Sequence, residues 1–317
     1  MKRVLVTGGA GFIGSHIVDE LVKQNFQVVV LDNLSTGKVE NVRHRHIEVH
    51  QWDITDPNVV EMITSLCPDY IIHQAAQVSV AESVKNPVQD EHINIKGSLH
   101  VIEAAVKARV KKLVFASSAA VYGNPLSLPI SIHHPTRPTS PYGLTKLTVE
   151  NYLKLNSQLN QLPYSILRYS NVYGPRQDAN GEGGVVAIFT DKLIKQVAPV
   201  IFGDGEQTRD FVYVKDVAKA NVKAMLAEQN LCVNISSGTS ITINQLFETM
   251  RKVAHSHVQV IYRPERLGDI RDSLLNNDEA KTEIDWEPVY DLQEGLQETF
   301  HHAAKMKNHT FDMVSNQ

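Results

Sequence analysis

The chain has 317 residues, of which 42% are hydrophobic and 21% charged, and its formal net charge is −4. This composition is ordinary for a globular protein with a real core, and the length predicts two domains or one large α/β unit. A small negative charge without a dense basic run argues against nucleic acid or an anionic membrane surface as a partner.

The two cysteines, Cys67 and Cys232, fit no metal-ligand spacing, and nothing else in the sequence indicates a metal. We expect both to be buried thiols of a reducing compartment. The N-terminus has no signal-peptide pattern, and no apolar run is long enough to span a bilayer. These features predict a cytoplasmic protein.

The first 170 residues alternate short strands, rich in Val and Ile, with amphipathic helices. The predicted strands are Arg3–Thr7, Gln27–Leu31, His46–Gln51, Tyr70–His73, Lys112–Ser117 and Tyr164–Arg168. The predicted helices are Phe12–Gln24, Val59–Ser65, Asn94–Ala108 and Tyr142–Asn156. This alternation predicts an α/β fold with a doubly wound parallel sheet of the Rossmann type.

After about Asn171 the alternation breaks. We expect the helices Val186–Gln196, Val217–Ala227, Asn244–Ala254 and Leu292–Lys305, and the strands Val200–Phe202, Phe211–Val214 and Asn234–Ser236. The pattern predicts a smaller α/β substrate domain, interleaved with the first. Residues 1–170 would form the dinucleotide-binding domain, with 211–240 returning to it, and 171–210 and 241–317 the substrate domain.

A glycine-rich turn, Gly9-Ala-Gly11-Phe-Ile-Gly14, follows the first predicted strand and opens a helix. Its glycines allow a tight turn and a close approach of the backbone, and the helix N-terminus stabilises phosphate charge. Asp32 ends the second strand, where it can accept hydrogen bonds from a ribose diol. No arginine follows it to hold a 2′-phosphate, so NAD is favoured over NADP. At the next strand end, Asp53-Ile54 is either a cap for the adenine or an ordinary loop segment.

A second motif, Tyr142-Gly-Leu-Thr-Lys146, places a tyrosine and a lysine on one face of a helix. A nearby ammonium lowers the pKa of a phenol from its usual value of roughly 10, which makes a usable general base. The strand end Ser117-Ser118 brings a hydroxyl to the same edge of the sheet. Such a pair alone is more often helix surface, but the glycine turn upstream favours a nicotinamide enzyme.

Seven segments carry a resemblance to a known family. They are Thr7–Gly14, Asp32–Gly37, His73–Ala76, Ser117–Gly123, Tyr142–Lys146, Arg168–Pro175 and Phe202–Val214. Over nearly its whole length the chain resembles the extended short-chain dehydrogenase/reductase superfamily, and most of all its nucleotide-sugar epimerases, the UDP-glucose 4-epimerase group.

The resemblance implies roles for individual residues. Tyr142 would be the base, Lys146 its electrostatic partner and Ser118 the hydrogen-bonding hydroxyl. NAD would be lined by Gly8, Gly11, Phe12, Ile13, Gly14, Asp32, Asn33, Ser35, Gly37, Asp53, Ile54, Gln74, Ala75, Ala76, Asn94, Ser117, Tyr142, Lys146 and Tyr169. The UDP-sugar would be bound by Ser118, Tyr142, Asn171, Val186, Val200, Phe202, Arg209, Arg266, Asp269 and Ser273.

The implied reaction is inversion at C4 of the sugar, by oxidation, rotation of the keto sugar and return of the hydride. Sugar dehydratases of the superfamily carry an acidic pair where this chain has Ala119-Ala120, which disfavours elimination. Val78 stands where some galactose epimerases have a lysine. The small Ser273 leaves room for an N-acetyl group at C2, so UDP-GlcNAc and UDP-GalNAc are expected substrates besides UDP-glucose and UDP-galactose.

Several alternatives stay open on the sequence. One is a UDP-uronic acid 4-epimerase, with Arg176 as the candidate cation for the carboxylate. Others are a nucleotide-sugar dehydratase or reductase, and a non-catalytic dinucleotide-sensing module, which would have no need of the base. The apolar faces of Asn94–Ala108 and Tyr142–Asn156 fit a homodimer built through a four-helix bundle, as is usual in the family, or burial against the chain's own sheet.

Overall fold

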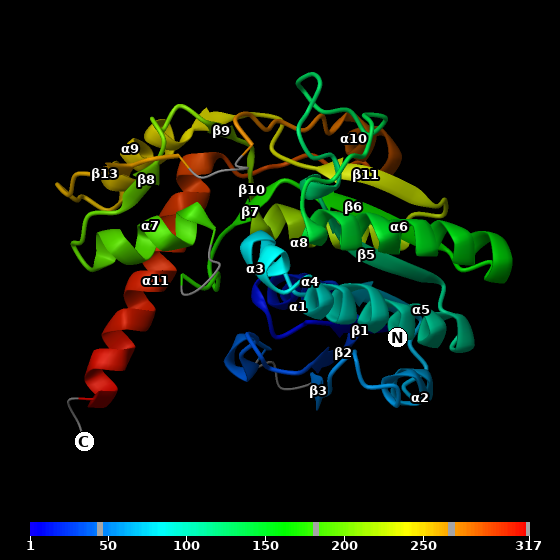
Figure 1. Cartoon of the computed structure of the whole chain (residues 1–317). Coiled ribbons are helices and arrows are strands. Elements are labelled where there is room, and N and C mark those ends of the chain that lie inside the picture. The colour runs from blue at the N-terminus through cyan, green and yellow to red at the C-terminus, as the bar shows by residue number, and fades with distance from the viewer. Residues whose placement is uncertain (43–46, 180–183, 266–269, 315–317) are drawn as a thin grey trace.

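The protein is described by a computed structural model covering residues 1–42, 47–179, 184–265 and 270–314. Its centre is a seven-stranded sheet in which every neighbouring pair is parallel, in the order β11-β6-β5-β4-β1-β2-β3 (Figure 1). The strands are β1 (Arg3–Thr7), β2 (Gln27–Asp32), β3 (Glu48–Gln51), β4 (Tyr70–His73), β5 (Lys112–Ser118), β6 (Tyr164–Tyr169) and β11 (Leu231–Ile235). The predicted doubly wound parallel fold is confirmed.

Helices cover both faces of this sheet. One face packs against α1 (Phe12–Lys23), α8 (Val214–Leu226) and α10 (Asp278–Ile284), and the other against α2 (Val59–Ser65), α5 (Gly97–Lys107) and α6 (Pro141–Asn160). Side chains alternate along each strand, so Val4 and Val6 of β1 join the first core and Leu5 joins the second. The strand order reverses beside β1, where a doubly wound sheet leaves a crevice for a ligand.

The remaining chain builds a smaller unit beside the sheet, on the left of Figure 1. Its core includes side chains from α7 (Val185–Ile194), α9 (Ile243–Val253) and α11 (Leu292–Val314). Three two-stranded sheets border it. They pair β7 (Asn171–Tyr173) with β10 (Phe211–Tyr213), β8 (Val200–Phe202) with β13 (Ile261–Arg263), and β9 (Thr208–Arg209) with β12 (Ile241–Thr242).

Two short helices that the sequence did not predict lie between β4 and α5. They are α3 (Val80–Lys85), capped by the Ser79 side chain, and α4 (Pro87–Glu91), with proline in its first turn. Helices of five or six residues hold too few apolar positions to show a 3.6-residue period, so only their caps could have indicated them. The predicted helix from Asn94 is a π turn, His92–Lys96, followed by α5.

The expectation that both cysteines are buried is wrong. Cys67 is exposed and Cys232 is half-buried, and both thiols are free. Cys67 lies directly after the C-cap residue of α2, with a positive φ of 45°. Burial raises the pKa of the Cys232 thiol to about 11, so this thiol is unreactive at neutral pH.

Candidate active site

The expected site residues come together at one edge of the central sheet. Because the strands are parallel, their carboxyl ends meet there, and these ends hold Thr7, Asp32, His73, Ser118 and Tyr169. In open α/β sheets a ligand binds outside this edge, at the point where the strand order reverses. The fold therefore gathers residues from five strands that are far apart in the sequence.

Two glycines of the turn after β1 leave no room for a side chain. Gly8 has φ of +66°, and a Cβ there would lie 2.6 Å from the backbone nitrogen of Ala75. A Cβ on Gly14 would lie 2.1 Å from the carbonyl oxygen of Gly8. Helix α1 begins at Phe12 after Gly11, which offers no side-chain cap, so the first N–H groups of the helix are available for a phosphate. This cradle fits a dinucleotide pyrophosphate.

Asp32 connects the glycine turn to the loop after β2. Its carboxylate accepts hydrogen bonds from the backbone N–H groups of Ala10 (2.9 Å) and Leu34 (2.8 Å) and is only 6% exposed. A Cβ on Gly37 would lie 2.8 Å from the same carboxylate, so the loop of Ser35 and Gly37 folds closely over it. The acid is thus held at the strand end, where a ribose diol would reach its remaining lone pairs.

A second carboxylate, that of Asp53, lies at the expected adenine side of the site. Asp53 follows β3 and accepts hydrogen bonds from the Asn33 side-chain amide (2.9 Å) and from the N–H and hydroxyl of Thr55 (2.8 and 2.7 Å). Burial opposes ionisation of Asp53, but these hydrogen bonds outweigh it and lower the pKa. Ile54 beside it is buried and packs against Gly97.

A polar network lies under the middle of the strand edge. Gln74, next to Ala75 and Ala76, donates to the Tyr169 hydroxyl and to the side-chain amide oxygen of Asn221 in α8 (3.2 Å each). Tyr169 and Asn221 also hydrogen bond with each other, and burial raises the pKa of Tyr169 to about 12. This tyrosine is therefore a neutral hydrogen-bonding group at the wall of the site.

Helix α6 brings the catalytic candidates to the end of β5. Lys146 is 4% exposed, and its ammonium donates to the Ala116 carbonyl oxygen of β5 (2.9 Å). The same nitrogen lies 5.8 Å from the centre of the Tyr142 ring. A Cβ on Gly143 would lie 2.5 Å from the Ala120 carbonyl oxygen, so this glycine lets the helix approach the turn after Ser118. Tyr142, Lys146 and Ser118 thus form one constellation, in which the Ser118 side chain opposes the rise in the pKa of the Tyr142 phenol.

The expected effect of Lys146 on Tyr142 does not govern the phenol in this structure. Burial raises the pKa of Tyr142 to about 12, and the hydrogen bond from Ser118 opposes that shift only in part. Burial also lowers the pKa of Lys146 to about 8, and the negative charge of Asp90 opposes that shift. The protein alone therefore holds Tyr142 as a phenol, because burial disfavours the charged phenolate.

Asn94 and Thr145 share a buried acid that the sequence did not indicate. The carboxylate of Asp90, which is 1% exposed, accepts from the amide of Asn94 (2.9 Å), the amide of Gln77 (2.7 Å) and the hydroxyl of Thr145 (3.0 Å). Burial raises the pKa of Asp90, against those hydrogen bonds and the charge of Lys146. No local pattern marks Asp90, because its partners come from three different elements.

The residues expected at the sugar nucleotide lie on short strands of the smaller unit. Asn171 is exposed, and Val200, Phe202 and Arg209 are half-buried on β8 and β9. The N–H of Ser273 donates to the Thr208 carbonyl oxygen (3.3 Å), which places Ser273 next to Arg209. Val186, in contrast, is packed inside the apolar core of α7, α9 and α11. Arg266 and Asp269 lie outside the described residues.

Arg176, the candidate cation for a uronic acid, pairs with a residue of α1. Its guanidinium lies 2.8 Å from the Asp19 carboxylate. The neighbouring Pro175 carbonyl oxygen contacts the His16 ring (3.0 Å), and Arg176 helps to lower the pKa of His16 to about 4, mainly a result of burial. Arg176 therefore fastens its loop to α1.

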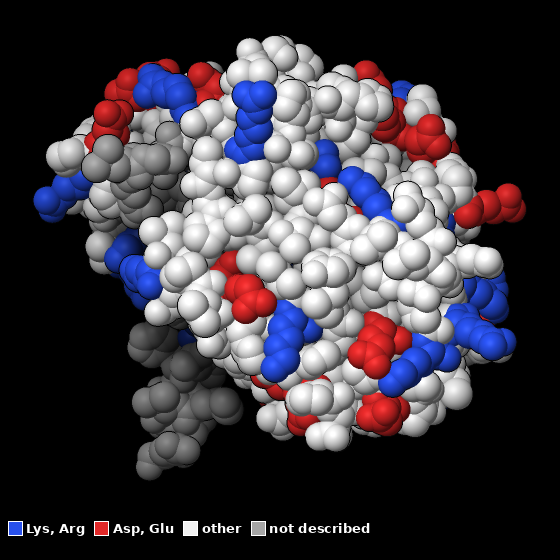
Figure 2. Space-filling model, turned by 45° about the vertical axis from the view of Figure 1, so that its right-hand side comes forward, with Lys and Arg blue, Asp and Glu red and all other residues white. Residues whose placement is uncertain are grey.

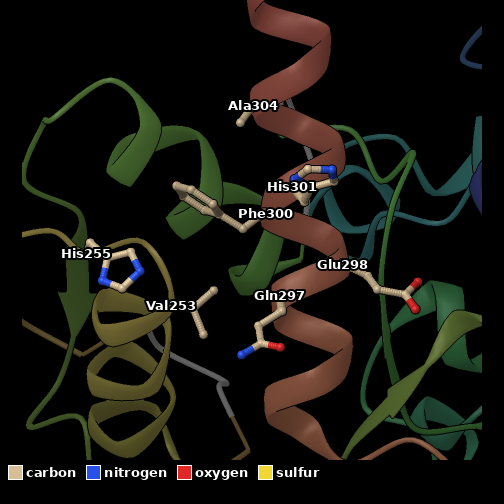
Figure 3. Close-up of a pocket in the computed structure, with 7 residues that line it drawn as sticks. All are labelled: Val253, His255, Gln297, Glu298, Phe300, His301 and Ala304. Carbon is tan, nitrogen blue, oxygen red and sulfur yellow. The ribbon is translucent and has the colours of Figure 1, made fainter.

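A cavity of about 530 Å³ between α9 and α11 is separate from this edge (Figure 3). Its lining is largely apolar and contains none of the expected site residues. The lining residues are Val253, His255, Gln297, Glu298, Phe300, His301 and Ala304. This hollow is therefore separate from the constellation of Ser118, Tyr142 and Lys146.

Residues 4–236 match the NAD dependent epimerase/dehydratase family. The chain belongs to this family. The family is NAD dependent, so the expected cofactor is confirmed. A Methanocaldococcus jannaschii protein provisionally named UDP-glucose 4-epimerase is 48% identical over 92% of this chain and 95% of its own length.

Solved structures agree with this assignment. The Thermotoga maritima UDP-glucose 4-epimerase, solved with UDP-glucose, has a TM-score of 0.93 and 44% identity, and covers 96% of this chain and 99% of its own. The Methanobrevibacter ruminantium UDP-N-acetylglucosamine 4-epimerase, solved with UDP-N-acetylmuramic acid, has a TM-score of 0.92 and 40% identity over 96% and 99%. The resemblance seen in the sequence to nucleotide-sugar epimerases is confirmed.

Proposed function

We propose that this chain is an NAD-dependent UDP-sugar 4-epimerase that interconverts UDP-glucose and UDP-galactose. The observation that carries the proposal is the constellation of Ser118, Tyr142 and Lys146 at the strand edge, beside a turn in which Gly8 and Gly14 leave no room for side chains. Relatives named UDP-glucose 4-epimerase, matched over nearly their whole length, support the same reaction.

In the proposed reaction, Tyr142, Ser118 and Lys146 have different roles at C4 of the sugar. NAD, when bound, supplies a hydride acceptor and a positive charge that favours the phenolate of Tyr142. Tyr142 accepts the proton of the 4-hydroxyl through the Ser118 contact and returns it after the keto sugar has turned over. Lys146 is held by the Ala116 carbonyl oxygen at the base of the site, with its ammonium 5.8 Å from the centre of the Tyr142 ring. No net oxidation results.

The turn after Ser118 supports inversion rather than elimination. Ala119–Val121 form a single 3₁₀ turn, capped by Ser118, whose hydroxyl accepts from the N–H of Ala120 (3.2 Å). Neither Ala119 nor Ala120 can donate or accept a proton. A dehydratase needs a general acid and base beyond the oxidation step, and this turn provides none.

We also propose that N-acetylated UDP-sugars are substrates. Ser273 is small and lies beside Arg209 on β9, so the space near the expected sugar C2 is not filled by a side chain from this position. The similarity to a UDP-N-acetylglucosamine 4-epimerase supports this specificity. A uronic acid is disfavoured, because Asp19 already pairs with Arg176.

We also propose the division into two domains that the sequence predicts. Residues 1–170 with 211–240 would bind NAD, and 171–210 with 241–317 would bind the UDP-sugar. In support, β11 pairs with β6 at the edge of the sheet, and α8 packs against α1. A dinucleotide-sensing module is the non-enzymatic alternative, but it would not need the catalytic constellation.

We propose a homodimer formed through α6 and its neighbours. Exposed apolar side chains gather on α6 and on the short helices beside it: Leu144, Tyr152, Leu155, Leu159, Val84 and Val88. In α5, Val101 and Ile102 are buried against the sheet and Leu99 is half-buried, so α5 contributes less than expected. In Figure 2, charged groups on this side are separated by broad uncharged areas. Such a face suits an isologous contact.

We further propose that the protein works in the cytoplasm. Both thiols are free, and one is exposed, which suits a reducing compartment. Among the described residues, no helix is both long enough and apolar enough to cross a membrane.

Proton NMR tests the proposed reaction. Purified protein would be incubated with UDP-galactose and, separately, with UDP-GalNAc, without added reductant. Conversion of both sugars is expected. Conversion of UDP-galactose alone would keep the reaction and refute the open C2 space, and conversion of neither by NAD-loaded protein would refute the proposed function.

A further inference from the structure

A buried ion pair joins helix α6, which carries Tyr142 and Lys146, to strand β6. Glu150 of α6 is 0% exposed, and Arg168 near the carboxyl end of β6 is 4% exposed. The guanidinium donates twice to the carboxylate, from Nε to Oε1 (2.9 Å) and from Nη2 to Oε2 (2.6 Å). A planar, two-point contact of this kind fixes orientation as well as distance.

Glu150 shares the inner face of α6 with the catalytic pair. Tyr142, Lys146 and Glu150 are spaced by four residues, so they form one row along the helix, about 12 Å long at 1.5 Å per residue. All three face the sheet. A fixed Glu150 therefore sets the rotation of the helix about its axis and its height over β5, and hence where Tyr142 and Lys146 lie.

Further hydrogen bonds join the pair to the rest of the site. The hydroxyl of Ser117 on β5 donates to Glu150 Oε1 (2.6 Å). Arg168 Nη1 donates to the Tyr122 hydroxyl (3.0 Å), which in turn donates to the Asn234 side chain of β11 (2.7 Å). The cluster thus ties α6 to three neighbouring strands and to the turn that carries Ser118.

Stability alone does not explain this arrangement. A buried ion pair contributes little relative to well-packed apolar residues of the same volume, because both charges lose their hydration. The Arg168 guanidinium is directed at Glu150 and Tyr122, so it is not offered to a ligand. What two rigid contacts add over apolar packing is a defined orientation of the helix.

We propose that the Arg168–Glu150 pair is a positioning device for catalysis, which holds α6 so that Tyr142 reaches Ser118 and Lys146 reaches Ala116. The inference rests on the proposed epimerase function. It makes Glu150 and Arg168 positioning residues, which act through Tyr142 and Lys146 without touching the substrate.

The decisive variant replaces both charges together, Glu150→Met with Arg168→Met. An apolar pair keeps the volume filled, so the thermal unfolding midpoint and NAD content should stay near those of the wild type. The kcat for UDP-galactose should fall roughly 10- to 100-fold with KM changed by less than about two-fold, because small misplacements of a catalytic group are costly. A wild-type kcat in this stable variant would overturn the proposal.

Arg168→Lys provides a second route if the double variant does not fold. Lysine keeps the charge but cannot make the two-point contact, so kcat should fall about 10-fold while the protein stays folded. An unchanged kcat here would also overturn the proposal. Lys154→Met is the matched control: Lys154 lies 4.0 Å from the same carboxylate, is partly exposed, and should leave kcat unchanged.

A crystal structure of the double variant separates this inference from the proposed reaction. If the wild type inverts no UDP-sugar, the proposed function fails, but the position of α6 still tests the pair. We expect the Tyr142 hydroxyl to be displaced from Ser118 in the variant. An unmoved helix would overturn the positioning role whatever the substrate is.

Discussion

The edge of the central sheet and the smaller unit beside it hold their functional side chains in opposite ways. At the sheet edge Asp32, Asn94 and Lys146 are at least 94% buried, and each is hydrogen-bonded to other groups of the protein. In the smaller unit Asn171 is exposed, and Arg209 and Ser273 are half-buried on two-residue or irregular segments. The reacting end is fixed by the fold, whereas the binding end stays open to solvent.

This difference suits the proposed reaction. Inversion at C4 needs a base and a cofactor in constant positions, and it also needs a sugar that can turn over between two half-reactions. Preorganised groups at the sheet edge can meet the first need. An open pocket held by a few polar contacts to the diphosphate meets the second. The contrast predicts that changes at the edge alter kcat, and that changes in the smaller unit alter the choice of substrate.

The largest effect is expected for Tyr142→Phe. Loss of the phenol removes general acid–base catalysis, so kcat should fall roughly 1,000-fold with NAD content unchanged. Steady-state kinetics with UDP-galactose would measure this. Tyr152→Phe, on the partly exposed side of the same helix, is the control and should keep full activity. Residual activity of Tyr142→Phe above a tenth of wild type would contradict the role of Tyr142.

A methyl group in the glycine turn should act on the cofactor. Gly8→Ala forces a clash at 2.6 Å with the Ala75 backbone, in addition to about 1–3 kcal/mol of strain at positive φ. We expect NAD to be lost during purification, as the absorbance of the denatured protein would show. Gly238→Ala has the same positive φ (+71°) but no contact below 3.4 Å, so it should keep its NAD. Loss of NAD from both variants would show that backbone strain alone is sufficient. Full NAD content in Gly8→Ala would contradict the role of the clash.

Ser273→Tyr should change the choice of substrate without changing the chemistry. A phenol ring in the space beside Arg209 should lower kcat/KM for UDP-GalNAc roughly 100-fold, on the scale by which pocket size discriminates ligands. The value for UDP-galactose should stay within about three-fold. Competition between the two sugars in one NMR sample measures the ratio directly. N-acetyl turnover at the wild-type rate would show that Ser273 does not border C2.

Asp90→Asn should shift the pH profile with a small change in the maximum rate. The charge of Asp90 raises the pKa of both Tyr142 and Lys146. Its removal lowers both, so the limb of the pH profile set by Tyr142 and the limb set by Lys146 should both move to lower pH. Glu91→Gln removes the same charge from the exposed neighbouring position and should leave both limbs in place. A lower plateau with unshifted limbs would mean that Asp90 acts through packing alone.

Much of the sheet region could be predicted from the sequence, because its signals are local. The glycine turn, Asp32 and the Tyr142–Lys146 spacing each lie within one strand–turn–helix segment, and the predicted β1, α2 and β4 have the observed bounds. Asp90 and the Arg168–Glu150 pair could not be identified, since their partners come from separate strands and helices. The one available signal was Glu150, an acid four residues after Lys146 on a helix face that is otherwise buried.

The smaller unit was harder to predict for a physical reason. Strands of two or three residues, such as β9 and β12, carry no readable alternation, and their pairing depends on contacts across the chain. Arg176 shows the same limit: its sequence context suggested a ligand cation, but the fold places it against Asp19.

The central claim is that one hydride leaves C4 and returns to its other face at a site organised by Tyr142. UDP-galactose deuterated at C4, incubated with the purified protein in ordinary water, tests this most directly. We predict UDP-glucose with the deuterium still at C4, observed by NMR and mass spectrometry. Loss of the deuterium to solvent, or release of an oxidised sugar without inversion, would contradict the account.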